Sequence, residues 1–387
     1  MSVRDVIIVG AGPSGLSAAI AAKQRGLEYQ VLEQGVLVNS IYDFPPQMVF
    51  FTTPELLEIG GLPFVSPFEK PTRNEALKYY RKVVDAYDLQ IAYEETVIAV
   101  TREDHGAGGA GRAGGAAEAG EAREEDERVF AVDTRSARGV CRVRHARNVV
   151  FAIGYYDHPV RLGIPGEDLP HVRHYYGEPH PYYRKRVVIV GGGNSAAESA
   201  LEMHRAGAHV TLVHRRSELK RTIKYWVRPD SENRIKEGSI VAKFGSCVKE
   251  IRPTSVVIGP GVDVSADTDA GIPAPADSFA AVAAGDTRPD VDPARLQQRE
   301  EEIPADAVFL LTGYRTDSLL MTRAGVALTD RDAPVIDPAT FETNVPGLFV
   351  AGGAIAGQDT GTIFIENGRF HGEKIIQVIA ERGRALG

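Results

Sequence analysis

Cysteine is scarce in this sequence, and the two that occur, Cys141 and Cys247, are far apart and form no C-x-x-C pair. A disulfide framework and a cysteine-based metal site are therefore not expected. None of the 10 histidines shows the spacing of a metal site. We predict that the protein binds no metal.

Long basic segments and long apolar segments are also missing. The net charge is −8, and without a basic cluster a nucleic-acid partner is not expected. No apolar run reaches the length of a membrane span, and the first residues show no signal-peptide pattern. We therefore expect a cytoplasmic protein that acts on small molecules and does not bind membranes.

The composition is that of a folded, soluble protein, with 43% apolar and 25% charged residues. Because 387 residues are too many for one ordinary hydrophobic core, we expect two domains. Residues 104–127 and 259–298 are rich in Gly, Ala, Asp, Glu or Pro and poor in residues that can be buried. We predict that both are inserts and that the first is a mobile loop.

The N-terminal region shows the order strand, Gly-rich turn, helix, strand. "DVIIVG" (5–10) is an apolar run typical of a buried parallel strand, "GLSAAIAAKQRG" (15–26) predicts a helix, and "YQVLEQ" (29–34) predicts the next strand. The same pattern returns in "RVVIVGGGNSAAESALEMHRAGAHVTLVHRR" (186–216). Two copies of one βαβ unit indicate two nucleotide sites.

The first turn, "GAGPSG" (10–15), has the glycine positions of a dinucleotide-binding loop. Gly10 permits the tight turn, Gly12 allows close approach of a pyrophosphate, and Gly15 allows close packing of helix on strand. Backbone N–H groups at the helix start would meet the phosphate charge. Glu33 ends the second strand, where a carboxylate accepts hydrogen bonds from ribose hydroxyls. The candidate residues here are Gly10, Gly12, Pro13, Ser14, Gly15 and Glu33.

The second turn, "GGGNSA" (191–196), repeats this pattern, but its second strand ends in "HRRSELKR" (214–221) instead of an acid. An acid would repel a 2′-phosphate, whereas arginine binds one with paired hydrogen bonds, so the second nucleotide is predicted to be NADPH. The alternative is a solvated basic helix start. The candidate residues are Gly191, Gly193, Asn194, Ser195, Ala196, His214, Arg215, Arg216 and Lys220. Because the second strand ends in an acid in one unit and in basic residues in the other, the two units are expected to bind different nucleotides, as in flavin reductases. FAD is therefore predicted on the first unit.

The rest of the chain predicts how the two units are connected. Strands of alternating character follow the first unit, "ADAVFLLTGY" (305–314) and "GLFVAGG" (347–353) predict buried strands, and residues 363–383 predict a closing helix. We predict an α/β fold of two Rossmann-like three-layer domains, with the NADPH domain inserted in the FAD domain. The predicted boundaries are 1–157 and 305–387 for FAD and 158–304 for NADPH.

Several motifs resemble a known family. "VVFAIG" (149–154), "FLLTGY" (309–314) and "TNVPGLFVAGG" (343–353) are similar to strand ends and the FAD-closing segment of two-dinucleotide flavoproteins of the thioredoxin-reductase type. More narrowly, "VLVNSIYDFP", "FFTTPELLEIGGLPF", "GYYDHP" and "FIENGRFHG" resemble the YpdA-type bacillithiol disulfide reductases. The resemblance covers nearly the whole chain apart from the two inserts.

This resemblance implies FAD on the first and last segments, NADPH on the inserted domain, and a homodimer. It places Asn39 and Ser40 near the flavin ring, the Val97 backbone near the adenine, and the backbone N–H groups of Thr362 and Ile363 near the flavin pyrimidine. The similar strand ends add four candidates, Ala152, Gly154 and Gly353 for FAD and Gly313 for NADPH.

The chain also departs from the family pattern. Thioredoxin reductases carry a C-x-x-C before the second unit, where this chain reads "VRHYYGEPHPYYRKR" (172–186). Bacillithiol disulfide reductases carry a cysteine in the first turn where this chain has Ser14, and a hydroxyl cannot form a mixed disulfide. Gly353 replaces an aspartate that contacts the ribityl chain in thioredoxin reductases. We assign no catalytic residue and expect Cys141 and Cys247 to be buried, inert thiols.

The combined prediction is an FAD-dependent, NADPH-oxidising oxidoreductase that passes hydride to the flavin and then reduces a bacillithiol-type disulfide. Two alternatives stay open for the electron acceptor. One is a ferredoxin- or quinone-type NADPH reductase, which the absent dithiol favours. The other is a nucleotide-binding redox sensor that turns over slowly.

Overall fold

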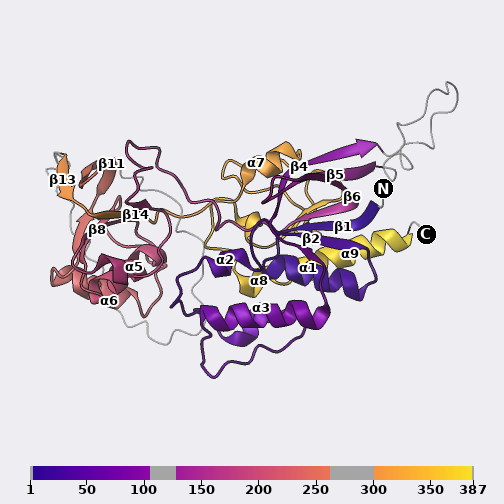
Figure 1. The fold of residues 1–387 in the computed structure, drawn as a ribbon, viewed down its shortest axis with the longest axis horizontal. Helices are drawn as coiled ribbons and strands as arrows, with labels where there is room; N and C mark the ends of the chain where they lie inside the picture. The colour runs from indigo at the N-terminus through magenta and orange to yellow at the C-terminus, as the bar shows by residue number, and fades with distance from the viewer. Residues whose placement is uncertain (1–2, 105–127, 262–299, 386–387) are drawn as a thin grey trace, which may run out of the picture. The chain divides into compact units, whose positions relative to one another are not determined.

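A computed structural model describes residues 3–104, 128–261 and 300–385 of the chain (Figure 1). The chain separates into two compact units: unit 1 comprises Met1–Val160 and Gly313–Gly387, and unit 2 comprises Arg161–Thr312. The inserts predicted at 104–127 and 259–298 lie outside the described residues, except for residue 104 and residues 259–261.

Unit 1 is built on a seven-stranded sheet with the order β3-β2-β1-β6-β5-β4, in which β15 also pairs with β6. Its strands are β1 (Val3–Val9), β2 (Tyr29–Leu32), β3 (Ile91–Ala92), β4 (Glu95–Asp104), β5 (Arg128–Ser136), β6 (Cys141–Phe151) and β15 (Leu348–Val350). β1 runs parallel to β2 and β6, whereas β4, β5 and β6 form an antiparallel meander. The carboxyl end of β6 lies between β1 and β15, with Phe151 opposite both Val9 and Val350.

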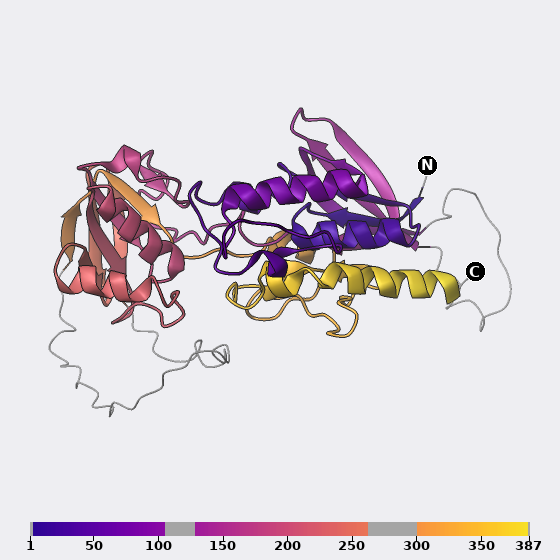
Figure 2. The ribbon, with the colours of Figure 1, turned by 90° about the horizontal axis from the view of Figure 1, so that it is seen from below.

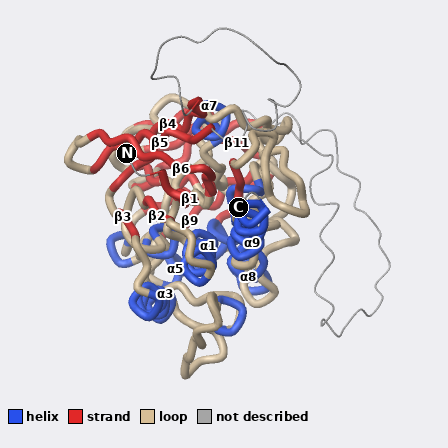
Figure 3. Tube along the Cα trace, turned by 90° about the vertical axis from the view of Figure 1, so that its right-hand side faces the viewer, coloured by secondary structure: helices blue, strands red, loops and turns tan. Residues whose placement is uncertain are grey.

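The apolar run in β1 is explained by burial on both faces of the sheet. Val6 and Ile8 belong to one core cluster with α1, α3 and α9, whereas Ile7 and Val9 belong to another with β4, β5 and α7. The helices of unit 1 are α1 (Pro13–Gln24), α2 (Asn39–Tyr42), α3 (Arg73–Tyr87), α7 (Ser318–Arg323), α8 (Ile365–Gly368) and α9 (His371–Ala385), with the short 3-10 helices η1 (Pro54–Leu57) and η4 (Gly352–Ala356). Figure 3 shows α1, α3 and α9 together on one side of the strands.

Unit 2 has a five-stranded parallel sheet with the order β10-β9-β8-β14-β7 and a three-stranded antiparallel sheet, β11-β12-β13. The strands are β7 (Val172–Arg173), β8 (Arg186–Val190), β9 (His209–His214), β10 (Val241–Phe244), β11 (Ser246–Arg252), β12 (Ser255–Pro260), β13 (Glu301–Pro304) and β14 (Ala307–Leu310). Helices α5 (Asn194–Arg205) and α6 (Arg228–Lys236) and the 3-10 helix η2 (His180–Tyr182) complete it. Val187 and Ile189 pack on the α5 side, and Val188 and Val190 pack on the other.

This architecture confirms the predicted α/β fold with two Rossmann-like units, and two details differ. The strand β14 pairs with β8, so unit 2 continues to Thr312 rather than ending near 304 as expected. The closing helix expected over 363–383 begins at Ile365 and is divided into α8 and α9 by a turn at residues 369–370.

Candidate cofactor sites

The first Gly-rich turn joins β1 to α1 and needs its glycines for different reasons. A Cβ atom at Gly10, whose φ is +107°, would collide with the Ala152 carbonyl, and one at Gly15 would collide with the Gly10 carbonyl. A Cβ at Gly12 would have nothing within 4 Å. Gly10 and Gly15 therefore allow the turn to pack on the end of β6, whereas Gly12 faces open space, as close approach of a pyrophosphate requires.

The N-terminus of α1 is suited to an anion. Gly12 is the N-cap, no side chain caps the helix, Pro13 occupies its first turn, and no acidic residue lies in that turn. The first N–H groups of a helix lack intrahelical partners and carry partial positive charge. A phosphate at this position would satisfy them.

Glu33 is buried at the end of β2, with 5% of its surface exposed. Its Oε2 accepts a hydrogen bond from the Ala11 N–H at 2.7 Å, and its Oε1 accepts one from the Gly35 N–H at 2.8 Å. Burial raises the carboxyl pKa, and these backbone hydrogen bonds oppose the rise. Glu33 thus fixes the first turn, and its remaining lone pairs can accept hydrogen bonds from ribose hydroxyls.

Asn39 and Ser40 begin the short helix α2, which the chain enters through a left-handed residue. Val38 has φ +49°, unusual for a β-branched residue, and its N–H donates to the Ala11 carbonyl at 3.2 Å. The Asn39 Nδ2 donates to Asp43 at 3.0 Å and to Asp157 at 3.4 Å. The structure therefore brings the start of α2 to the first turn. It adds Asp157, which the sequence did not single out.

Three further residues predicted to contact FAD, Ala152, Gly154 and Val97, lie at neighbouring strand ends of unit 1. The Ala152 N–H donates to the Val9 carbonyl at 2.8 Å, and a Cβ at Gly154 would lie 3.9 Å from the Ser40 Oγ. Val97 lies at a β-bulge in β4, close after Glu95, whose N–H donates to the Glu33 carbonyl at 2.8 Å. These positions surround the carboxyl ends of β1, β2 and β6, where open α/β sheets bind ligands.

The C-terminal segment contributes Gly353, Thr362 and Ile363. A Cβ at Gly353 would lie 2.8 Å from the Tyr155 ring. Thr362 and Ile363 precede α8 and are not part of it: the Thr362 carbonyl accepts a hydrogen bond from the Asn367 amide at 3.0 Å. Because α8 has four residues, the long helix expected to begin at these residues is replaced by a turn that Asn367 holds.

Ser14 is turned toward the C-terminal segment. Its hydroxyl donates to the Gly368 carbonyl at 3.0 Å, and a Cβ at Gly352 would collide with its Oγ. The Gly352 N–H in turn donates to the His371 Nδ1 at 3.2 Å. The Ser14 hydroxyl therefore joins the first turn to α8.

The second Gly-rich turn, in unit 2, repeats the geometry of the first. A Cβ at Gly191 would collide with the Leu311 carbonyl and lie 3.0 Å from the Ala196 Cβ. At Gly193 the nearest atom to such a Cβ is the Lys220 Cδ, at 4.0 Å. Gly193 is the N-cap of α5, which has neither a side-chain cap nor an acid in its first turn. This turn is therefore also suited to a pyrophosphate.

Asn194 and Ser195 differ in their surroundings. The Asn194 Oδ1 accepts a hydrogen bond from the Lys224 N–H at 2.9 Å, which ties α5 to the loop after β9. Ser195 is exposed. Gly313 has φ +111°, and its carbonyl accepts a hydrogen bond from the Val160 N–H at 2.9 Å. Gly313 thus belongs to unit 1, whereas the other NADPH candidates belong to unit 2.

The four basic candidates after β9 fall into two classes. His214 is 6% exposed, and its ring fills the space beside Gly192. Its Nε2 is buried and has no hydrogen-bond partner among the described residues. Burial and the charges of Arg216, Arg215 and Lys220 lower its pKa to about 4. Arg215 and Lys220 are exposed, Arg216 is partly exposed, and the Lys220 N–H donates to the Gly192 carbonyl at 2.9 Å. The neutral His214 therefore supports the turn while the three cations surround it.

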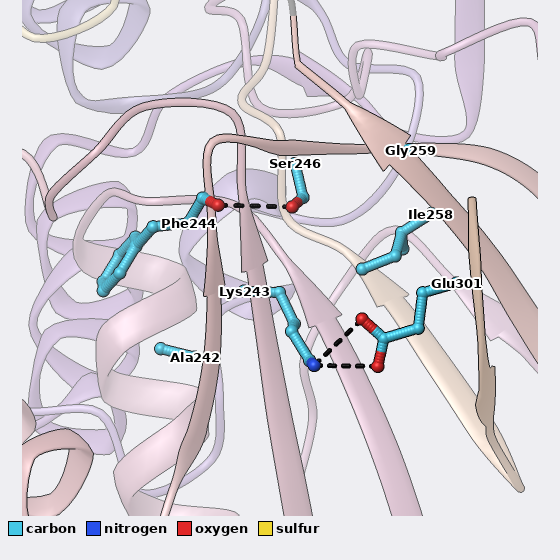
Figure 4. A pocket seen from close by; sticks show the side chains of 7 residues that line it. All are labelled: Ala242, Lys243, Phe244, Ser246, Ile258, Gly259 and Glu301. Carbon is cyan, nitrogen blue, oxygen red and sulfur yellow. Dashed lines mark hydrogen bonds and ion pairs between the residues drawn. The ribbon is translucent and has the colours of Figure 1, made fainter. Parts of the chain in front are cut away.

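The pocket that the described residues form in unit 2 lies apart from these candidates. A hollow of about 290 Å³ lies in unit 2 between β10 and β13, beside the ion pair of Lys243 and Glu301 (Figure 4). None of the predicted site residues lines it. Within the described ranges there is no group of three or more His, Cys, Asp or Glu side chains placed to hold a metal, and no helix there is long and apolar enough to cross a bilayer.

The two cysteines lie in different units. Cys141 begins β6 in unit 1 and is exposed, and Cys247 is partly exposed in β11 of unit 2. The expectation that both are buried is therefore wrong, because Cys141 stands at the edge of the meander where its strand begins. Neither cysteine has a second cysteine in its own unit with which to form a dithiol.

Comparison with known proteins places these sites in context. The family model for pyridine nucleotide-disulphide oxidoreductases matches residues 7–108 and 121–282. The chain is 36% identical to bacilliredoxin reductase Bdr of Bacillus subtilis (strain 168) over 99% of both chains. It is 27% identical to a ferredoxin–NADP reductase of Ignicoccus hospitalis over 58% of this chain and 62% of that protein. The solved structure of bacillithiol disulfide reductase Bdr (YpdA) from Bacillus cereus superposes with a TM-score of 0.81 at 34% identity, covering 98% of this chain and 100% of that one.

Proposed function

The chain belongs to the pyridine nucleotide-disulphide oxidoreductase family, and from this membership we propose that it reduces bacillithiol disulfide or a related low-molecular-weight disulfide. The resemblance to YpdA-type proteins is confirmed, and the protein is a flavoprotein reductase whose cofactors are FAD and NADPH. One observation supports the assignment of FAD to one site and NADPH to the other. The first Gly-rich turn lies beside the buried carboxylate of Glu33, whereas the second lies beside the three cations Arg215, Arg216 and Lys220.

We assign FAD to unit 1. The first turn and the α1 N-terminus would hold the pyrophosphate, Glu33 the ribose, and Asn39, Ser40, Gly154 and the turn before α8 the flavin. FAD would supply a two-electron carrier between NADPH and the disulfide. The chain's own groups would orient the ring and exclude water from it. We therefore propose FAD on residues 1–157 and 313–387 and NADPH on residues 158–312, because β14 belongs to the sheet of unit 2.

We assign NADPH to unit 2. The turn at Gly191–Gly193 would hold its pyrophosphate, and Arg215, Arg216 and Lys220 would surround the 2′-phosphate. His214 would act by supporting the turn, since its ring is buried beside Gly192. Charge-assisted hydrogen bonds from arginine to phosphate are strong and planar, so this corner would discriminate NADPH from NADH.

An anaerobic electron-transfer experiment tests the proposed function. Purified yellow protein is mixed with NADPH until the flavin absorbance is bleached, and bacillithiol disulfide, ferredoxin or a quinone is then added separately. Rapid reoxidation by the disulfide alone is expected. Reoxidation only by ferredoxin or quinone would favour a reductase of that type, and reoxidation by none of them would favour a redox sensor.

Nucleotide preference tests the second site independently of the acceptor. The double substitution Arg215→Ala with Arg216→Ala is expected to raise the KM for NADPH by at least about tenfold, because each charge-assisted hydrogen bond is worth about 1.5–3 kcal/mol. The KM for NADH should change little. Arg221→Ala, an exposed arginine of the same loop that pairs with Glu218, is the matched control. Equal weakening of both nucleotides would contradict the assignment of the 2′-phosphate site.

The proposal also includes the oligomeric state and the cellular location of the protein. The resemblance implies a homodimer, which size-exclusion chromatography with light scattering would test. A cytoplasmic location is also proposed, and cell fractionation would test it.

A further inference from the structure

Tyr155 lies against the backbone of the C-terminal segment at the edge of the first site. It follows the end of β6, and a Cβ atom at Gly353 would lie 2.8 Å from its Cδ1 and Cε1 atoms. The strand ends that bring the two together are fixed, because the Ala351 N–H donates to the Phe151 carbonyl at 2.8 Å. The ring of Tyr155 therefore takes the space that any side chain at position 353 would need.

The Tyr155 side chain is partly exposed, and its hydroxyl makes no hydrogen bond within the part of the chain that the structure describes. Buried or half-buried tyrosine hydroxyls usually have one. Burial, with smaller contributions from Glu366 and Tyr314, raises the pKa of Tyr155 to about 12. The phenol therefore keeps its proton at physiological pH and is a hydrogen-bond donor.

The acidic group that contributes to the raised pKa of Tyr155 is engaged elsewhere. Glu366, in α8, accepts a hydrogen bond from the side chain of Thr52, and burial raises its pKa. Thr52 is itself buried. The carboxyl that influences Tyr155 electrostatically thus already has a donor, and Tyr155 remains a donor without an acceptor of its own.

We propose that Tyr155 is a flavin-positioning residue, whose hydroxyl donates a hydrogen bond to the FAD bound at the carboxyl ends of β1, β6 and β15. Gly353 must lack a side chain so that the ring can occupy this place. The inference rests on the proposed function, because it requires FAD in unit 1. It adds a determinant of FAD binding that consists of two residues far apart in sequence.

Removal of the hydroxyl alone is the first test. Tyr155→Phe apoprotein is reconstituted with FAD, and the dissociation constant and the visible flavin spectrum are measured. The loss of one hydrogen bond is expected to weaken FAD binding by about 3- to 10-fold and to shift the flavin absorption. Tyr156→Phe is the matched control: its ring packs on Phe44 and Tyr314, and we expect the FAD affinity and spectrum of the wild type. A Tyr155→Phe protein with both properties unchanged would overturn the inference.

The requirement for a glycine at position 353 is tested by a double-mutant cycle in which the dissociation constant of FAD is measured. Gly353→Ala should weaken FAD binding strongly, because the new methyl group displaces the Tyr155 ring. In a Tyr155→Ala background the same substitution should have little further effect. If the two substitutions raise the dissociation constant of FAD independently, so that their fold-changes multiply, Tyr155 and Gly353 are not coupled and the inference is contradicted. Circular dichroism of each apoprotein checks that the variants are folded.

The same experiments separate this inference from the proposed function. A wild-type protein that binds no FAD overturns both. Tight FAD binding by the wild type together with a neutral Tyr155→Phe substitution overturns the role of Tyr155 and leaves the proposed function intact.

Discussion

At the scale of single residues, Ser14 illustrates how a turn residue can connect distant segments. Its hydroxyl donates to the Gly368 carbonyl, 354 positions away in sequence. The family resemblance described above implies a cysteine at this position, and a thiol is a weaker hydrogen-bond donor than a hydroxyl. In this chain the side chain therefore stabilises the contact between α1 and α8.

Ser14→Ala tests that role. The substitution leaves the Gly368 carbonyl without its donor and is expected to lower the free energy of unfolding by about 1 kcal/mol, measured by urea denaturation of the apoprotein. Ser195→Ala, the exposed serine of the second turn, should change it by less than about 0.5 kcal/mol. Equal effects of the two substitutions would argue against a stabilising hydrogen bond at Ser14.

His214 predicts a pH dependence of stability. Its folded-state pKa is lowered to about 4, so the unfolded chain binds the proton more readily, and stability is lost as pH falls from about 6.5 towards 4. On lowering the pH from 7 to 5, the titration of His214 should lower the free energy of unfolding by about 2 kcal/mol.

His214→Phe keeps a ring beside Gly192 and removes the titration. We expect the variant to lose less unfolding free energy than the wild type between pH 7 and pH 5, as measured by urea denaturation of the apoprotein. His209→Phe, at an exposed position in the same strand, is the control. Parallel pH profiles of the wild type and His214→Phe would show that the buried imidazole does not limit stability in acid.

At the scale of elements, the packing of α9 on α1 holds the C-terminal segment against the first site. Figure 2 shows the yellow α9 beside the indigo α1. The two backbones meet at Gly372, where a Cβ would lie 2.5 Å from the Ala18 nitrogen and 2.5 Å from the Ser14 carbonyl oxygen. Because these atoms belong to the helix backbone, they cannot move aside without shifting α1.

Two alanine substitutions in α9 separate this contact from helix propensity. Gly372→Ala should destabilise the protein by about 1–3 kcal/mol through overpacking and lower its retention of FAD. Gly383→Ala, in the same helix with nothing within 4 Å, should be neutral or stabilising by up to about 1 kcal/mol. Thermal unfolding with and without added FAD measures both effects. A neutral Gly372→Ala would mean that α9 can shift on α1 without cost.

Elements that local patterns specify were predictable from the sequence. The apolar run of β1, the Ala-rich helix α1 and both Gly-rich turns follow from residues close together in the chain. The pairing of β14 with β8 was not predictable, because an apolar strand does not show which sheet it joins. The burial of His214 was missed for a similar reason: only the fold shows that Gly192 leaves room for its ring. The contact of Tyr155 with Gly353 likewise depends on two strand ends meeting.

At the scale of the whole molecule, the distribution of sulfur limits how many electrons the protein can hold. The chain has two cysteines, and they lie in different units, Cys141 at the start of β6 and Cys247 in β11. A reductase with a redox-active dithiol can store a second electron pair beside that of its flavin. Neither unit contains two cysteines that could form such a dithiol within it, so we expect FAD to be the two-electron store.

An anaerobic titration with NADPH measures this capacity. Because a hydride carries two electrons, one equivalent of NADPH per FAD should bleach the flavin completely, and no further NADPH should be oxidised until an acceptor is added. The Cys141→Ser/Cys247→Ser double variant should give the same stoichiometry and the same rate of disulfide reduction. Consumption of a second equivalent by the wild type alone would reveal a thiol-based store. A variant that is bleached normally but no longer reduces the disulfide would instead show that one of these separate thiols passes electrons to the substrate.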